Sequence, residues 1–259
     1  MKLIHRLFIV EVLLCFAWFL QPQYANSAKV ILLAGGGGGG SAFSSTFVSH
    51  GEDTAGGTTV TYNCGSSCAF GATNTNRLMV VVVCDRNTVT NSTGNSVTAL
   101  TVGGTSASQV ASAAGQSSAG FQMSDIWQAT GVAGTSGNIV VTWANSSTRG
   151  SVGVYRVITA TTARTSANGT AGTSGNSLNT SITVPSGGAG ISVYGNRAPG
   201  NANNITWTNA TSDYNADQIG ANTTCGSATS SSAGATTVTA SISGSASTDV
   251  AMSSATWGP

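Results

Sequence analysis

The feature that most limits the fold of this chain is a regular succession of short β-forming runs and turn residues. From Thr58 onward, β-branched and aromatic residues gather in short runs separated by Gly, Asn and Ser, at a spacing of roughly 8 to 15 residues. No apolar pattern of helical period extends over about 10 residues beyond position 28. The sequence therefore predicts an all-β protein, specifically an antiparallel two-sheet sandwich of jelly-roll-like form with Gly/Ser/Thr/Asn-rich loops.

The predicted strands cover residues 58–62, 78–84, 97–102, 123–129, 139–143, 152–159, 178–184, 190–194, 204–207, 236–242 and 250–257. Two segments composed almost entirely of small polar residues, 165–177 and 226–235, are predicted to be exposed loops. No strict sequence period is visible, which argues against a propeller or a β-helix.

Charged side chains are unusually scarce. Lys and Arg number 9 and Asp and Glu 8, or 7% of the 259 residues, where an ordinary globular chain has about 25%. Hydroxyl and glycine residues take their place, with 36 Ser, 36 Thr and 34 Gly. A net charge of +1 excludes a basic nucleic-acid-binding surface, and 40% apolar residues suffice for a core. Solubility must come from hydroxyls and amides.

The first 28 residues have the layout of a secretory signal peptide. Lys2 and Arg6 precede an apolar run over 7–20, and small residues follow up to Ala28. An uncleaved anchor is the alternative, but this run is interrupted by Glu11 and is shorter than the roughly 20 residues that a spanning helix needs. We therefore predict export with cleavage near Ala28, a secreted or cell-surface protein, and no membrane span after cleavage.

Two further segments follow the predicted signal. Residues 29–41 contain six consecutive glycines and are predicted to be a linker or an extended first edge. Residues 42–259 are predicted to form the β-sandwich domain. Its strands fit either one two-sheet domain or two sub-domains that split near residue 160.

Export changes the interpretation of the cysteines. Cys15 lies in the predicted signal, which leaves Cys64, Cys68, Cys84 and Cys225 in an oxidising compartment. Four cysteines allow three pairings. We favour Cys64–Cys68 and Cys84–Cys225, because Cys84 ends an apolar strand and Cys225 follows in a polar segment, predicted to be a loop. The alternative is that Cys84 is a buried free thiol.

Several strand and turn motifs resemble those of a known group of proteins. The motifs are Arg-Leu-Met-Val-Val-Val at 77–82, Val-Thr-Ala-Leu-Thr-Val-Gly-Gly at 97–104, Ile-Trp at 126–127, Ser-Gly-Asn-Ile-Val-Val-Thr at 136–142 and Val-Gly-Val-Tyr-Arg-Val at 152–157. Over about residues 77–259 the chain resembles uncharacterised β-sandwich proteins of phages and prophages, which are often virion- or tail-associated. The resemblance implies a structural role and, in a phage, a virion-surface location. The signal peptide departs from that pattern.

The inventory for catalysis is small. After residue 28 the candidate acids and bases are His50, Glu52, Asp53, Asp85, Asp125, Asp213, Asp217 and Asp249. His50 lacks a nucleophile-elbow context, which disfavours a serine hydrolase. A glycosidase needs two carboxylates about 5 to 9.5 Å apart, and Glu52 with an aspartate is the pair that the sequence offers. We predict that the protein is not an enzyme.

Two binding functions are open to a chain of this composition. Asp213, Asn215 and Asp217 offer oxygen ligands within five residues, so they are candidates for Ca²⁺ binding, although the full calcium-loop spacing is missing and no cofactor is otherwise predicted. Sugars stack on aromatic rings and bind neutral amides and hydroxyls. The candidate glycan contacts are Trp207, Tyr214, Asn204 and Asn209.

The sequence therefore supports two functional hypotheses. The first is a non-catalytic structural or display protein at a cell or particle surface, whose partners are other surface or particle proteins or copies of itself. The alternative is a lectin-like carbohydrate-binding module. No nucleic acid is expected as a partner of either.

Overall fold

A computed structural model describes the chain in several stretches. They are residues 43–87, 96–117, 120–159, 164–172, 175–197, 204–216, 223–243 and 249–259, together with the backbone of the short strand β1 (Val30–Leu32). The predicted signal peptide lies outside the described residues, as does the segment 29–41 apart from β1. Strand β1 pairs with the next strand of the chain, so this part of the segment is an extended edge.

All regular structure in the described residues is β-strand, which confirms the predicted all-β class. The first half contributes β2 (Ser44–Asp53), β3 (Gly57–Tyr62), β5 (Arg77–Asn87), β6 (Val97–Val102), β8 (Ser108–Ser117), β9 (Gly120–Thr130), β11 (Ile139–Ser147) and β12 (Arg149–Ile158), with the two-residue strands β4 (Cys68–Ala69), β7 (Thr105–Ser106) and β10 (Ser136–Gly137). The second half contributes β13 (Ser166–Gly172), β14 (Ser177–Val184), β15 (Ala189–Arg197), β16 (Ile205–Thr208), β17 (Thr211–Ala216), β18 (Thr223–Ser230), β19 (Gly234–Ile242) and β20 (Asp249–Trp257).

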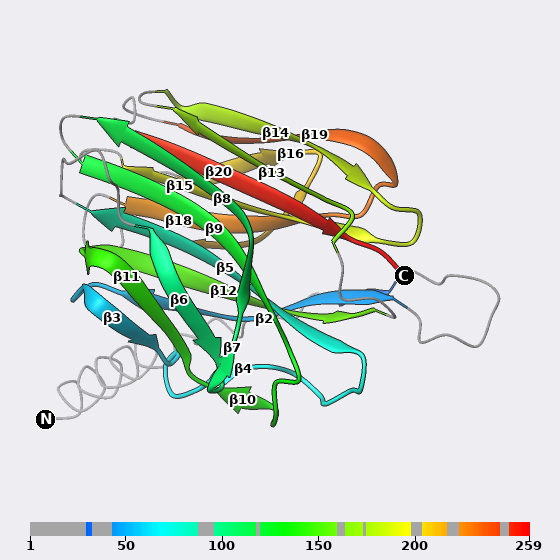
Figure 1. The fold of residues 1–259 in the computed structure, drawn as a ribbon. Coiled ribbons are helices and arrows are strands. Elements are labelled where there is room, and N and C mark those ends of the chain that lie inside the picture. Colours follow the sequence, from blue (N-terminus) through cyan, green and yellow to red (C-terminus); the bar gives the residue numbers. More distant parts are fainter. Residues whose placement is uncertain are drawn as a thin grey trace, which may run out of the picture.

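All strands except β4 and β10, which pair only with each other, form four stacked layers (Figure 1). A first outer sheet, β3-β11-β6-β7, covers a first inner sheet, β1-β2-β12-β5-β9-β8. A second inner sheet, β13-β20-β15-β18-β17, lies against the first inner sheet and is covered by a second outer sheet, β14-β19-β16. Each half of the chain is thus a two-sheet antiparallel sandwich, and the two sandwiches pack back to back.

The two sandwiches have the same topology. Without the short strands β1, β4, β7 and β10, each half has eight strands. In chain order, the first, eighth, third, sixth and fifth of them form the inner sheet of each half, and the second, seventh and fourth form its outer sheet. This is the jelly-roll order with the fifth strand moved to the edge of the inner sheet. The chain is therefore a tandem structural repeat, which the sequence does not reveal through any strict period.

The repeats contact each other as the halves of a twofold dimer do. Strand β9 contacts β20, and its counterpart β18 contacts β12. Strand β9 also contacts β15 as β18 contacts β5, and β8 contacts β13 as β17 contacts β2. Strand β5 contacts its own counterpart β15. These reciprocal contacts define a pseudo-twofold axis near the middle of the β5–β15 crossing.

Alternation along β5 explains how one strand serves two cores. Val81 and Val83 face the first outer sheet and join Ile139 and Trp143 there, whereas Val82 faces the second inner sheet. All eleven residues of the strand are buried. The continuously apolar run in β5 is explained by its position, because the first outer sheet covers one face of the strand and the second inner sheet covers the other.

Both segments predicted to be exposed loops contain strands, so these two predictions are wrong. Residues 166–172 form the edge strand β13, and residues 223–230 form β18, an internal strand that is buried throughout. Cys225 accordingly lies in a strand and not in a loop. Small side chains are required here, because β18 lies between two layers.

Several buried hydroxyls hydrogen-bond with one another, some of them across the layers. Tyr155 from the first inner sheet shares a short hydrogen bond with Ser227 of β18. In the second sandwich, the hydroxyl oxygens of Ser192 and Ser254 lie 2.7 Å apart. The Ser254 hydroxyl also shares a hydrogen bond with the Thr180 hydroxyl of the outer sheet. The high Ser/Thr content is thus compatible with a packed interior, since buried hydroxyls are costly only when they lack partners.

Candidate functional site

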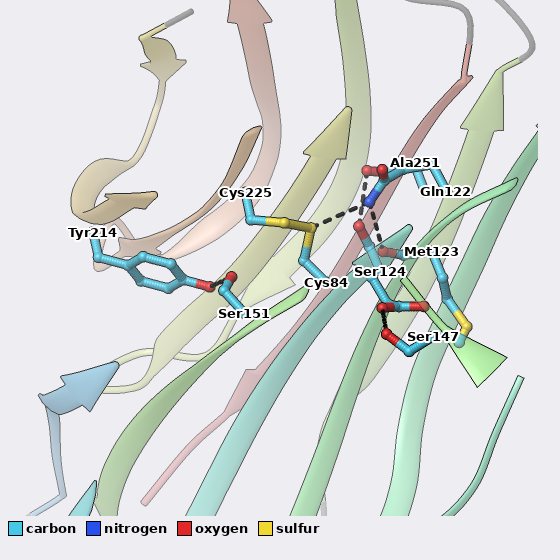
Figure 2. The surroundings of a disulfide bond; sticks show 10 residues. Cys84, Gln122, Met123, Ser124, Ser147, Ser151, Tyr214, Cys225 and Ala251 are labelled. Carbon is cyan, nitrogen blue, oxygen red and sulfur yellow. Dashed lines mark hydrogen bonds between the residues drawn. A yellow bond between two sulfur atoms is a disulfide. The ribbon is translucent and has the colours of Figure 1, made fainter. Parts of the chain in front are cut away.

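The described residues contain two disulfides, in the pairing favoured from the sequence. Cys64 and Cys68 are bonded within a short loop. Cys84 of β5 is bonded to Cys225 of β18, with a Cα–Cα distance of 5.9 Å. The second bond joins the two sandwiches across their interface, as Figure 2 shows. Two disulfides fit an oxidising, extracellular environment.

The interface around this disulfide is tightly packed. The Gln122 amide donates to the Cys84 sulfur at 3.2 Å and to the Met123 carbonyl at 3.3 Å. On the same side, Ser124 donates to the carbonyl of Ala251 at 3.0 Å (Figure 2). The Ser124–Ala251 bond connects the two inner sheets directly, whereas both Gln122 bonds lie within the first inner sheet.

Tyr214 lies inside the molecule rather than on its surface. Only 6% of the residue is exposed, and its hydroxyl lies 3.1 Å from that of Ser151 (Figure 2). Its ring stacks on His50 and Phe47, with ring centroids 5.3 and 5.7 Å away. Burial raises the pKa of the phenol well above its ordinary value. The structure therefore gives Tyr214 a packing role, and no glycan contact is assigned to it.

The other candidate sugar contacts each have their own packing or hydrogen-bond partner. Trp207 packs against the core of the second sandwich and is opposite the buried Ala240 in the β16–β19 pairing. The side-chain Oδ1 of Asn204 accepts a hydrogen bond of 3.1 Å from the Asn215 amide. Asn209 occupies the turn between β16 and β17 with a positive φ of 61°, and its amide donates to the Thr237 carbonyl at 2.8 Å.

Asn209 borders a hollow of about 510 Å³, which we call the hydroxyl hollow. Two turns and the strand ends beside them form it, β16–β17 on one side and β18–β19 on the other. Its lining residues are Asn209, Ala210, Thr211, Thr229, Ser230, Ser231, Ser232, Ala235, Thr236 and Thr237. None carries a charge, and most present a hydroxyl. The hollow offers many neutral hydrogen-bonding groups and no aromatic ring.

The three candidate calcium ligands do not share a site in the described residues. Asp213 accepts hydrogen bonds from the hydroxyls of Tyr155 at 2.9 Å and Thr229 at 2.6 Å. Asn215 instead bonds Asn204, and Asp217 lies outside the described residues. No group of three or more His, Cys, Asp or Glu side chains with metal-binding geometry occurs in the described part of the chain. No calcium proposal rests on this segment.

The remaining acids and bases are dispersed. The Nε2 atom of His50 lies 3.8 Å from the Oε1 atom of Glu52, near the surface. Asp125 is fully buried in the first inner sheet, where Gln109 donates to it at 3.1 Å and Trp127 at 3.4 Å. Burial raises the pKa of Asp125 to about 6, although the hydrogen bonds, including one from Ser112, oppose the shift.

Comparison with protein-family models, with curated proteins and with solved structures found no match for this chain. A search of the described residues for a helix long and apolar enough to cross a membrane found none.

Proposed function

We propose that this chain is a non-catalytic structural or display protein of an extracellular or particle surface. The observation that carries the proposal is the back-to-back pairing of two like sandwiches, locked by one disulfide. Such a body is stiff, because its two inner sheets are packed on both faces. Stiffness and neutrality suit a scaffold that presents loops and needs no charged site.

Immunogold labelling with antibodies against the purified protein tests this proposal. Intact cells or particles that carry the gene are expected to be labelled on their outer surface, and protease treatment of intact cells is expected to remove the label. Label that appears only after the cells are permeabilised would contradict the surface location. A strain that lacks the gene is the control for antibody specificity.

A second function, glycan binding, is supported by the hydroxyl hollow alone. Neutral hydroxyl and amide groups around a shallow hollow can form the multiple hydrogen bonds that a sugar requires. The absence of an aromatic ring from its lining favours hydrogen bonding over stacking as the basis of recognition. Trp207 and Tyr214, which pack elsewhere, take no part in this proposal.

A glycan array followed by titration of any hit tests this function. Thr211→Val and Thr236→Val together remove two lining hydroxyls without changing side-chain size, and are expected to weaken binding about tenfold. Thr59→Val, on an exposed position of β3 in the other sandwich, is the matched control and is expected to leave binding unchanged. Equal losses in both variants, or no hit on the array, would contradict glycan binding at this hollow.

A further inference from the structure

Two rows of polar side chains face each other at one end of the layer between the inner sheets. Antiparallel pairing sets Arg149, Arg86 and Gln122 side by side on the first inner sheet. On the second inner sheet it sets Asp249, Arg197 and Thr223 side by side. We call these six residues the arginine mouth.

The two rows point toward each other. Arg86 follows Cys84 by two residues, so its side chain leaves β5 on the same face, toward the disulfide partner sheet. Arg197 follows Gly195 by two residues, and a Cβ at Gly195 would point at the Cys84 sulfur. The arginine mouth thus lies between the inner sheets, two residues beyond the disulfide along each strand. Arg86 and Arg197 occupy equivalent positions in the two repeats.

The charges of the arginine mouth do not balance. It holds three guanidinium groups and one carboxylate, which gives a net charge of +2. The carboxylate belongs to Asp249, whose oxygen lies 3.3 Å from the Arg197 guanidinium. Like charges placed directly opposite on neighbouring strands, as in Arg86 and Arg149, destabilise a sheet.

Arg86 is the most buried of the three arginines. It is only 6% exposed, and its Nε has no hydrogen-bond partner; neither has the Nε of Arg149 nor the Thr223 hydroxyl. Burial, together with repulsion from Arg197 and Arg149, lowers the pKa of Arg86 to about 10, against the opposing effect of Asp249. The group therefore stays cationic at neutral pH. A buried cation that keeps an unpaired N–H donor attracts an anion.

We propose that the arginine mouth binds a small oxyanion, a carboxylate, sulfate or phosphate group, between Arg86 and Arg149. A guanidinium group presents paired N–H donors that match two oxygens of such an anion. Arg149 is only partly buried and Arg197 keeps 19% of its side chain exposed, so solvent reaches the arginine mouth at these two residues. The anion neutralises the excess charge and accepts from donors that are otherwise unpaired.

This site is independent of the hydroxyl hollow and of the surface role proposed above. The same chemistry has two natural sources: a free inorganic ion, or an acidic group on a glycan or other polymer. Sulfate, phosphate and a galacturonic acid trimer are therefore the three probes. A neutral galactose trimer is the control for the third.

Isothermal titration calorimetry on the purified protein at fixed ionic strength is the test. Saturable one-site binding of at least one acidic probe is expected, and Arg86→Gln and Arg149→Gln are each expected to weaken it at least tenfold. Arg164→Gln removes an exposed arginine elsewhere and is expected to change affinity by less than twofold. Tighter binding of the trimer than of sulfate would identify an acidic polymer as the source, and the reverse would identify a free ion.

Two results would overturn the proposal. One is the lack of saturable binding of all three acidic probes to the unmodified protein. The other is an equal loss of affinity in Arg164→Gln. Asp217 supplies a further check. It lies outside the described residues and is close in sequence to Thr223 of the arginine mouth. Binding seen in Asp217→Asn but not in the unmodified protein would show that an internal carboxylate occupies the arginines, which also rules out an external ligand.

Folding of each variant is checked by thermal unfolding before titration. If Arg86→Gln does not fold, Arg149→Gln alone decides, since Arg149 is partly exposed and its replacement disturbs packing less.

Discussion

Buried polar residues determine much of this protein's behaviour at the scale of the residue. The chain has few charges, and several of them lie in the interior, where water does not screen them. Asp125 shows the consequence most clearly. It lies in β9 opposite Ser112 of β8 and accepts hydrogen bonds from Gln109 and Trp127, which do not fully compensate for its burial.

We predict that the protein is more stable at pH 5 than at pH 7 because of Asp125. Its pKa is about 6 in the folded protein and near 3.8 when unfolded, so the folded state binds the proton more tightly. The cost of the buried charge is therefore fully present above pH 6 and is relieved as the pH falls from 6 toward 4. The gain between pH 7 and pH 5 is about 1 kcal/mol.

Urea denaturation at the two pH values measures this effect. Asp125→Asn should abolish most of the pH dependence, because the amide does not titrate. An unchanged pH dependence in that variant would assign the effect to another group.

Close approach between strands governs packing at the scale of the element. Strands β5 and β15 cross at the pseudo-twofold axis, where Cys84 and its counterpart Gly195 meet. A Cβ at Gly195 would lie 2.5 Å from the Cys84 sulfur and 2.4 Å from the Gln122 amide nitrogen. Position 84 and its equivalent, position 195, point into the same small space between the sheets. Only one of the two positions can therefore carry a side chain.

Gly195→Ala is therefore expected to destabilise the fold by about 1 to 3 kcal/mol through overpacking. The backbone of Gly195 does not have a positive φ, so the loss is steric and not conformational. Ser181→Ala on the exposed side of β14 is the control, with an expected change below about 0.5 kcal/mol. A Gly195→Ala variant as stable as the unmodified protein would show that β5 and β15 can separate at little cost.

The elements also show what the sequence could and could not reveal. Strands with several β-branched residues, such as β6 and β14, lie where their patterns predict them. Strands β13 and β18 were predicted to be loops, because small polar residues have low intrinsic strand preference. They form strands because the surrounding layers supply the packing. Cys225, a residue predicted to be paired with a distant strand, was the one signal that β18 is internal.

The sites were harder to predict than the strands. Asn209 borders the hydroxyl hollow, but the turns that complete the hollow are distant in sequence, so no local pattern indicates it. Arg86, Arg149 and Arg197 are not singled out by the sequence, because they lie at the ends of three different strands, far apart in the chain. Only the pairing register brings them together.

The Cys84–Cys225 bond is the main covalent link at the scale of the whole molecule. It closes a separation of 141 residues and joins one sandwich to the other. Its pseudo-equivalent positions, Gly195 and Ser124, cannot form a second bridge. A single disulfide, close to the pseudo-twofold axis, therefore links the two sandwiches covalently across their interface in the described residues.

Cys84→Ala with Cys225→Ala is expected to cost about 3 to 5 kcal/mol, and Cys64→Ala with Cys68→Ala about 2 kcal/mol, because the second loop spans only four residues. Urea denaturation of both double variants under oxidising conditions measures the difference. Equal losses would mean that loop length does not set the contribution of the long-range bond.

The stacking of four sheets also bears on how fast backbone amides exchange with solvent. The two inner sheets have another sheet on each face, so strands β5, β15 and β20 expose almost no surface from which local opening can begin. The outer strands β3 and β14 have one open face with alternating exposed residues. Hydrogen exchange should therefore divide the chain into a slow centre, whose protons leave only on global unfolding, and two faster outer layers that open on their own.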